Sequence, residues 1–321
     1  MTNREDYQPV DPSVVPRFAG LATFMRTVTR EIIEEVDVGL VGVPFDLGLN
    51  HRTGARQGPA GVREMSRLIR RVHPTSGIRP FEICNVADLG DAPVNPMSKD
   101  KSIDMIRDFF IEMKGANIVP IACGGDHTIP LPILRALAVD EPVGLLHFDA
   151  HADTLDEICG DKVNHATFMR RGYEEGLIDP KRTIQIGIRG PAEALWDFSY
   201  SSGMTVIHIE ELYAMGLDAV VAKAKEVVGD GPTYVSFDVD GMDPVYAPGT
   251  GTPEVGGFTS FEAQQMLRGL MGINIVGADL VEVSPPFDTA GTTSLNGVQM
   301  MWELLCLMAH KIGTEKGRLD D

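Results

Sequence analysis

The sequence predicts an α/β protein with a mostly parallel β-sheet and helices on both of its faces. Eight short apolar runs, rich in β-branched residues, alternate with segments of helical periodicity. Several of these runs stop at Asp, His or Glu, as expected where parallel strands end at a ligand-binding edge. A closed eight-stranded barrel has the same strand count and is the main rival, since it also binds ligands at strand carboxyl ends.

The apolar runs can be assigned in chain order. The expected strands are residues 38–43, 83–86, 117–123, 143–148, 183–188, 205–209, 233–237 and 275–281. The first expected helix opens at Pro59 and places Val62, Met65, Leu68 and Ile69 on one face. The later helices are expected at residues 103–113, 129–137, about 218–228, 261–271 with Ser260 as a cap, and 295–312.

Composition favours one globular unit. The 321 residues are 43% hydrophobic and 23% charged, and no Gly/Pro-rich linker, repeat or low-complexity segment interrupts them. We therefore expect a single domain over 1–321. Its first 35 residues form an irregular segment, in which the apolar stretch 16–26 packs on the body or on a neighbouring subunit.

Charge and cysteine usage exclude several classes of protein. A net charge of −18 argues against nucleic-acid binding; it is compatible with cationic ligands, although solubility explains it more simply. The N-terminus is too polar for a signal peptide, and no apolar run has the ~18–20 residues of a membrane span. The four cysteines, Cys84, Cys123, Cys159 and Cys306, form no C-x-x-C pair, which favours a cytoplasmic protein without disulfides.

Candidate metal ligands gather in the stretch LLHFDAHAD. Asp149, His151 and Asp153 follow an apolar run at alternate positions, which lie on one side of an extended chain. Matching residues follow other runs: His127 in GGDHTI, Asp238 and Asp240 in SFDVDG, and Glu282 in LVEVSPP. We expect these segments to converge on metal ions.

The ligand types indicate two divalent ions. Two imidazoles and four Asp carboxylates are too many for one catalytic ion with open positions, but fit two ions that share bridging carboxylates. This donor set suits Mn²⁺ best, with Ni²⁺, Fe²⁺ or Co²⁺ as alternatives. His147 is interpreted as structural or supporting, and His51, His73 and His310 as surface residues. DVDGMDP lacks the closing Glu of a calcium loop, and APGTGTPEVGG lacks dinucleotide-loop spacing.

The motifs GGDHTI, DAHAD, SFDVDGMDPVYAPGTGTPEVGG and EVSPPFD resemble those of the ureohydrolases, the arginase and agmatinase family, in the family's order. The resemblance extends over nearly the whole chain and implies the open three-layer α/β/α sheet of arginase rather than a barrel. It also implies a hydrolase that uses two metal ions to cleave a guanidino group to urea and an amine.

The resemblance implies roles for individual residues. His127, Asp149, Asp153 and Asp238 match the ligands of one ion. The ligands of the other ion are matched by His151, Asp149, Asp238 and Asp240, so that Asp149 and Asp238 bridge. His165, in NHATF, matches the proton-shuttle histidine, and Glu282 the carboxylate that pairs with the guanidinium. Asp153 is expected to hydrogen-bond the attacking hydroxide and then the tetrahedral intermediate.

The substrate is less defined by the sequence. The chain lacks the arginase-like SGNLHG stretch, so the resemblance is closer to the agmatinase and guanidino-acid hydrolase branch, with agmatine, 4-guanidinobutanoate or 3-guanidinopropanoate as substrate. A terminal amine could meet Asp156, Glu157 or Asp161. A carboxylate could meet Lys162, Arg52 or Arg56. Ala166 stands where this branch commonly has Gly, which leaves room for free guanidine or a biguanide such as metformin.

Two other interpretations stay open. The first is a metal-dependent deacetylase with one zinc ion, and the second is a non-catalytic partner subunit of a guanidine hydrolase. The resemblance further implies a homo-oligomer, a trimer or hexamer, with the N-terminal segment contributing contacts.

Overall fold

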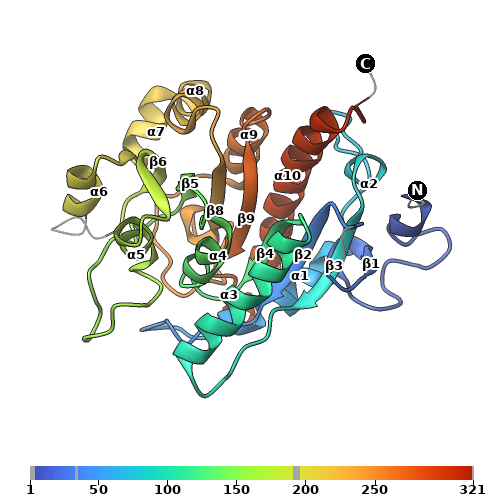
Figure 1. Cartoon of the computed structure of the whole chain (residues 1–321), viewed down its shortest axis with the longest axis horizontal. Coiled ribbons are helices and arrows are strands. Elements are labelled where there is room, and N and C mark those ends of the chain that lie inside the picture. Colours follow the sequence, from blue (N-terminus) through green and yellow to red (C-terminus); the bar gives the residue numbers. More distant parts are fainter. Residues whose placement is uncertain (1–3, 33–34, 191–195, 320–321) are drawn as a thin grey trace.

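The fold of the chain is an open, nine-stranded, all-parallel sheet in a computed structural model that describes residues 4–32, 35–190 and 196–319 (Figure 1). The strands are β1 (Val28–Thr29), β2 (Val38–Val43), β3 (Val86–Asp91), β4 (Val119–Gly124), β5 (Val143–Phe148), β6 (Ile178–Ile188), β7 (Thr205–His208), β8 (Thr233–Asp238) and β9 (Ile275–Val281). The predicted open sheet is confirmed and the barrel is excluded. The predicted count of eight strands is wrong, because the short β1 pairs with β3 at one edge.

Helices cover both faces of this sheet. They are α1 (Gly58–Ser66), α2 (Pro80–Ile83), α3 (Lys99–Gly115), α4 (Pro130–Leu137), α5 (Phe168–Glu174), α6 (Asp197–Ser202), α7 (Ile209–Met215), α8 (Leu217–Val228), α9 (Ser260–Gly269) and α10 (Thr292–Glu315). Strand side chains alternate between two apolar cores. Leu146 and Phe148 join the core that contains α9 and α10, while Leu145 joins the core that contains α3 and α4.

The spatial order of the strands positions the functional residues. The sheet runs β1-β3-β2-β4-β9-β8-β5-β6-β7, so β4, β9, β8 and β5 are neighbours although they are far apart in the sequence. Each of these four strands is followed by one of the predicted motifs. Parallel strands end at the same edge of a sheet, and the four motifs therefore meet there.

Several local expectations were wrong. The strand expected at 83–86 begins only at Val86, because residues 80–83 form α2. Thr259, not Ser260, caps α9: its hydroxyl accepts from Glu262 N at 3.1 Å, and the Glu262 carboxylate accepts from Thr259 N. Helix α1 ends at Ser66, before Leu68, which is exposed.

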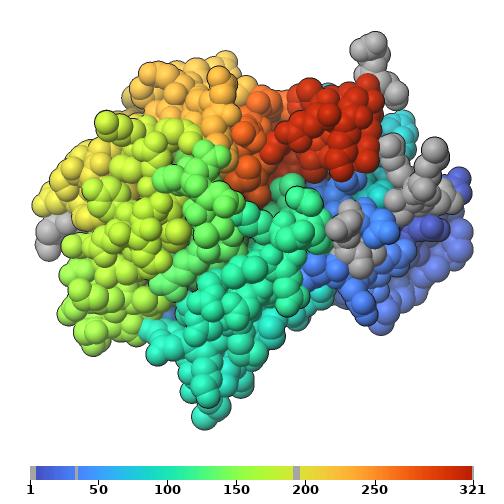
Figure 2. Space-filling model, in the orientation of Figure 1, coloured from blue at the N-terminus to red at the C-terminus, as the bar shows by residue number. Residues whose placement is uncertain are grey.

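The N-terminal segment lies against the edge that β1 forms, at one end of the molecule (Figures 1 and 2). Phe24 and Met25 are buried in the core beside α1 and α2, whereas Val14, Phe18 and Leu21 are 78%, 88% and 85% exposed. The single domain over 1–321 stays a prediction. Among the described residues, no helix combines the length and apolar character needed to cross a membrane.

Candidate metal centre

The centre of the site is His127, which follows β4 and is buried. Its Nδ1 lies 2.9 Å from Asp149 Oδ2, 2.9 Å from Asp153 Oδ2 and 3.1 Å from Asp238 Oδ2. One ring nitrogen carries at most one proton, so it cannot satisfy three carboxylates by hydrogen bonding. Although burial acts in the opposite direction, these carboxylates hold the pKa of His127 well above its usual value.

A buried hydrogen-bond chain behind His127 fixes its tautomer. Ser236 Oγ donates to Asp279 Oδ1 at 2.7 Å, and Tyr234 Oη donates to Asp279 Oδ2 at 2.7 Å. Because the Ser236 hydroxyl directs its hydrogen to Asp279, its oxygen accepts from His127 Nε2, 2.8 Å away. When the ring is neutral, its Nδ1 then presents a lone pair to three carboxylates. Such an arrangement is repulsive unless a cation lies among these atoms.

The second half of the cluster forms around His151. Its Nδ1 lies 3.1 Å from Asp240 Oδ2 and 3.5 Å from Asp149 Oδ1. Burial, and then the neighbouring Asp240 and Asp149, raise the pKa of Asp238 well above its usual value. The structure thus brings together all six residues that the sequence proposed as ligands. Two overlapping groups have donor atoms within 4.8 Å of one another: His127, His147, Asp149 and Asp153, and Asp149, His151 and Asp240.

Local backbone geometry aims these side chains. Asp149 Oδ1 accepts from His151 N at 2.6 Å, and Asp238 Oδ1 accepts from Asp240 N at 2.8 Å, which orients both carboxylates. Asp153 and Glu282 have positive φ values of 51° and 65°, which are uncommon for residues other than glycine and store strain at the site.

The residues fit a pair of divalent ions on structural grounds. His127 Nδ1 and Asp149 Oδ2 are buried and have no hydrogen-bond partner among the described residues. Four buried Asp carboxylates share the space with two imidazoles, a donor set that suits hard or borderline cations. His147 also belongs here: its Nε2 lies 2.9 Å from Asp149 Oδ2, and Gln185 Nε2 contacts its Nδ1 at 3.1 Å.

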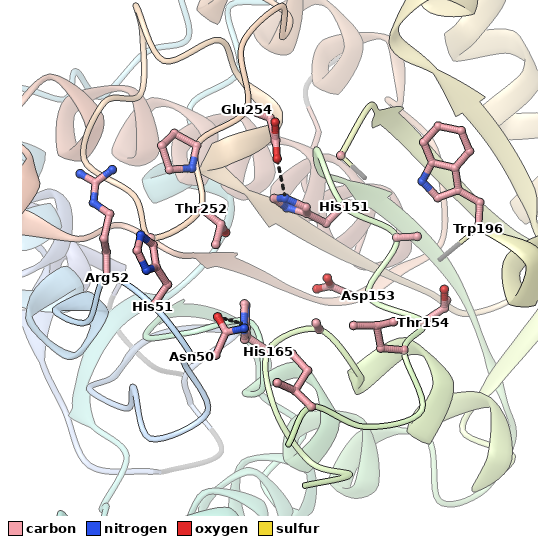
Figure 3. Close-up of a pocket in the computed structure, with 17 residues that line it drawn as sticks. Asn50, His51, Arg52, His151, Asp153, Thr154, His165, Trp196, Thr252 and Glu254 are labelled. Carbon is pink, nitrogen blue, oxygen red and sulfur yellow. Dashed lines mark hydrogen bonds and ion pairs between the residues drawn. The ribbon is translucent and has the colours of Figure 1, made fainter. Parts of the chain in front are cut away.

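A cavity of about 490 Å³ opens above the cluster and is lined by His151, Asp153 and His165 (Figure 3). Arg52 lies on one side of it and Trp196 on the opposite side (Figure 3). His165 Nε2 lies 3.2 Å from Asn50 Oδ1, and burial lowers the pKa of its imidazole. The volume is that of a pocket for a small molecule.

Glu282 is buried and lies behind Gly251, one of the residues that line the cavity. Its Oε1 accepts from His127 N at 2.8 Å, whereas its buried Oε2 has no hydrogen-bond partner among the described residues. Burial, followed by Asp238 and Asp126, raises its pKa well above the usual value. Gly251 lines the cavity, and a Cβ built on it would lie 3.5 Å from Oε2. The free oxygen is therefore close to the cavity.

Of the residues predicted to bind the tail of the substrate, only Arg52 lines the cavity. Arg52 lines the cavity, with its guanidinium 3.9 Å from the centre of the Phe287 ring. Asp156 does not line it and binds Arg171 Nη2 at 2.7 Å. The remaining candidates also lie outside the lining: Arg56 pairs with Asp46, Asp161 with Lys99, Lys162 lies near Asp156, and Glu157 is exposed.

Sequence reasoning missed several contributors. Glu254 Oε1 lies 3.7 Å from His151 Nε2 (Figure 3), and Asn50 contacts His165. Arg189 donates to the carbonyls of Asp240 and Glu254 and so ties two loops of the site together. Of these residues, only Asn50 could have been predicted from the sequence, because it lies two positions before the candidate Arg52.

Comparisons with known proteins agree with this geometry. A model of the arginase family matches residues 36–307. Guanidinopropionase of Pseudomonas aeruginosa is 53% identical over 94% of this chain and 96% of its own length. Guanidinobutyrase of the same organism is 43% identical over 94% and 97%. The solved structure of proclavaminate amidino hydrolase from Streptomyces clavuligerus is 37% identical, with a TM-score of 0.89 over 92% of this chain and 99% of that one.

Proposed function

The chain belongs to the arginase family, and we propose that it hydrolyses the guanidino group of a small guanidino compound to urea and an amine. The observation that carries this proposal is the cluster around His127, which lies beside a small-molecule cavity and next to Glu282, whose buried Oε2 has no hydrogen-bond partner among the described residues. A carboxylate in such a place calls for a cationic partner, and a guanidinium is one.

The proposed ligands are His127, Asp149, Asp153 and Asp238 for one ion, and His151, Asp149, Asp238 and Asp240 for the other, with Mn²⁺ first and Ni²⁺ second. When bound, a pair of divalent ions supplies one kind of chemistry, the ionisation of a water near neutral pH. His147 orients the Asp149 carboxylate in this proposal, because its Nε2 lies 2.9 Å from Asp149 Oδ2.

Glu282 binds the substrate in this proposal. A guanidinium is planar, and its charge is spread over three nitrogens, so a carboxylate oxygen can hold one edge and fix the face that is presented for attack. Oε1 is already engaged by His127 N, which leaves Oε2 for the substrate. The raised pKa of Glu282 falls when a cation arrives, because the cation stabilises the carboxylate.

Asp153 and His165 handle the proton. Asp153 accepts a hydrogen bond from the attacking water, because it lies at both the cluster and the cavity. The lowered pKa of His165 keeps its imidazole largely neutral at neutral pH, so it can take a proton and pass it to the leaving amine.

The first substrate to consider is 3-guanidinopropanoate, because a relative with 53% identity is named guanidinopropionase. Arg52 at the cavity supports a substrate with a carboxylate tail, whereas Asp156 gives no such support to an amine tail, since its carboxylate is engaged by Arg171. Agmatine and 4-guanidinobutanoate remain the alternatives. Ala166, which lines the cavity, keeps free guanidine and biguanides among the compounds to test.

We also propose a cytoplasmic homo-oligomer, a trimer or hexamer. The exposed Phe18 and Leu21 of the N-terminal segment favour a contact between copies. Cys123, Cys159 and Cys306 are free thiols, which suits a reducing compartment. Light scattering of the purified chain tests the assembly.

The activity is tested by a urea-release screen. The substrates are agmatine, 4-guanidinobutanoate, 3-guanidinopropanoate, arginine, guanidine and metformin, each with Mn²⁺ and with Ni²⁺ supplied. Urea from at least one compound supports the proposal. Absence of urea from every compound, with two ions bound, favours the non-catalytic subunit, and a single bound zinc ion with amide hydrolysis favours the deacetylase.

A further inference from the structure

A second pocket, of about 360 Å³, lies between the N-terminal segment and the residues that follow α1. Its lining includes Arg17, Arg26, Arg70 and Arg71, with Asp11 as the one acidic residue. It shares no lining residue with the cavity above the metal centre. Figures 1 and 2 place the N-terminal segment at one end of the molecule.

The charge of this pocket is opposite to that of the chain. Four arginine residues line it, although the chain has a formal net charge of −18. Asp11 compensates them poorly: it lies 3.8 Å from Arg71 Nη2, and its Oδ1 accepts from Ser13 N at 2.8 Å and from Ser13 Oγ at 2.6 Å. Positive charge therefore dominates this pocket.

Arg26 is the most buried of the four arginines that line the pocket. Arg26 is only 5% exposed. Its Nη2 donates to Val15 O at 2.7 Å, and its Nη1 has no hydrogen-bond partner among the described residues. Its backbone has a φ of 61°, a conformation that costs energy for a residue other than glycine. Nη1 is covered by protein atoms, so an anion in the pocket would stabilise the buried Arg26 charge through electrostatic attraction rather than through this nitrogen.

The other arginines surround the same space. Burial, and then repulsion from Arg70, Arg26 and Arg71, lowers the pKa of Arg17. Arg70 Nη1 donates to Leu68 O at 2.9 Å, and Arg71 Nη2 donates to Pro9 O, which holds both guanidinium groups in place. An anion among them would turn mutual repulsion into attraction.

We propose that this pocket binds a small oxyanion with two or more negative charges. Guanidinium groups pair with carboxylate and tetrahedral oxyanions through parallel N–H···O bonds, and several groups together favour a ligand with several charged oxygens. The volume lies in the range of small-molecule sites and holds such an anion. This inference does not depend on the proposed hydrolase activity.

The test is direct binding to the full-length, metal-loaded protein. Sulfate and succinate are the probes, a tetrahedral dianion and a dicarboxylate, each titrated by calorimetry against sodium chloride at equal ionic strength. Arg17→Gln and Arg70→Gln are the test variants, because their side chains are less buried than that of Arg26 and the fold should tolerate the changes. Arg107→Gln is the matched control, an arginine on α3 that pairs with Asp104 and Asp108.

We expect saturable binding of at least one probe, weakened about tenfold or more by Arg17→Gln and Arg70→Gln and unchanged by Arg107→Gln. A preference between the probes identifies the ligand as tetrahedral or carboxylate. The proposal is overturned if neither probe binds saturably, or if all variants bind as the wild type does. It is also overturned if the test variants alter only the oligomeric mass by light scattering, which would assign the pocket to a contact between copies.

Discussion

The side chain of Glu282 is tied to the backbone of His127: Glu282 Oε1 accepts from His127 N at 2.8 Å. Glu282 N also donates to Gly125 O at 2.9 Å, so the ends of β9 and β4 are joined by two hydrogen bonds. The carboxylate of the proposed substrate site and the imidazole of the metal cluster are thereby held in one fixed arrangement. Only Glu282 Oε2 is left for a ligand.

Glu282→Gln should bind the same number of metal ions as the wild type but lose turnover. The amide keeps the size of the side chain and removes the negative charge that would face the guanidinium. We expect kcat/KM for the best substrate to fall by about 10²–10⁴. Metal analysis and urea release on the same sample check this, and an unchanged kcat/KM would place the guanidinium elsewhere.

Ser236→Ala should weaken metal binding without removing a metal ligand. The change breaks the chain from Asp279 to His127 Nε2 and frees the ring to rotate or change tautomer. We expect about 10–100-fold lower metal affinity, measured by competition with a chelator. The control is Ser199→Ala, a buried serine on α6 whose hydroxyl has no hydrogen-bond partner among the described residues. Equal affinities in the two variants would refute the positioning role.

His165→Ala should lower kcat by about 10²–10⁴ and change KM little, because the imidazole moves a proton rather than holding the substrate. Its lowered pKa means that the neutral form predominates at neutral pH, and wild-type kcat should decline as the pH falls below the ordinary histidine value of 6.5. That acidic decline should be absent or shifted in the variant. The control is His310→Ala on α10. A variant with wild-type kcat and the same pH profile would remove the shuttle role.

Asp37→Asn should reduce stability in a pH-dependent way. Burial raises the pKa of Asp37, but bonds from Lys316, Asn85 N and Arg318 outweigh it, so the folded-state pKa is lowered. The stabilisation is therefore present above the unfolded pKa, about 3.9, and is lost as the pH falls through the folded value. Urea unfolding of wild type and variant should give free energies that converge at acidic pH. The exposed Asp104→Asn is the control, and a pH-independent difference would contradict the assignment.

Much of the fold could be predicted from short-range pattern. Residues 143–148 and 275–281 form strands with the expected bounds, because both are apolar runs buried on two faces. The strand β3 was misplaced because its buried Asp88 breaks the apolar pattern. Arg63 Nε binds that carboxylate at 2.9 Å, a long-range ion pair that no local pattern reveals. The short β1 has too few residues to show a period.

In the site, too, local sequence pattern predicted some features, whereas others depend on contacts between distant segments. The proposed ligands were visible because each follows an apolar run, whereas the adjacency of β4, β9, β8 and β5 is a property of the sheet order. His73 was expected at the surface and is only 2% exposed, since its Nε2 contacts Glu303 Oε2 at 2.8 Å. The partner lies 230 residues away, so sequence proximity could not indicate it. The same is true of Glu254 beside His151.

The most direct test of the central claim is the metal content of the purified chain after loading with Mn²⁺ or Ni²⁺ and dialysis, compared with Asp149→Asn. Asp149 contacts both His127 and His151, so its charge is shared by the two halves of the cluster. The account predicts about two ions per wild-type chain, and loss of metal together with urea release in the variant. One ion or none in the wild type, or an Asp149→Asn variant that keeps both ions and full activity, would contradict it.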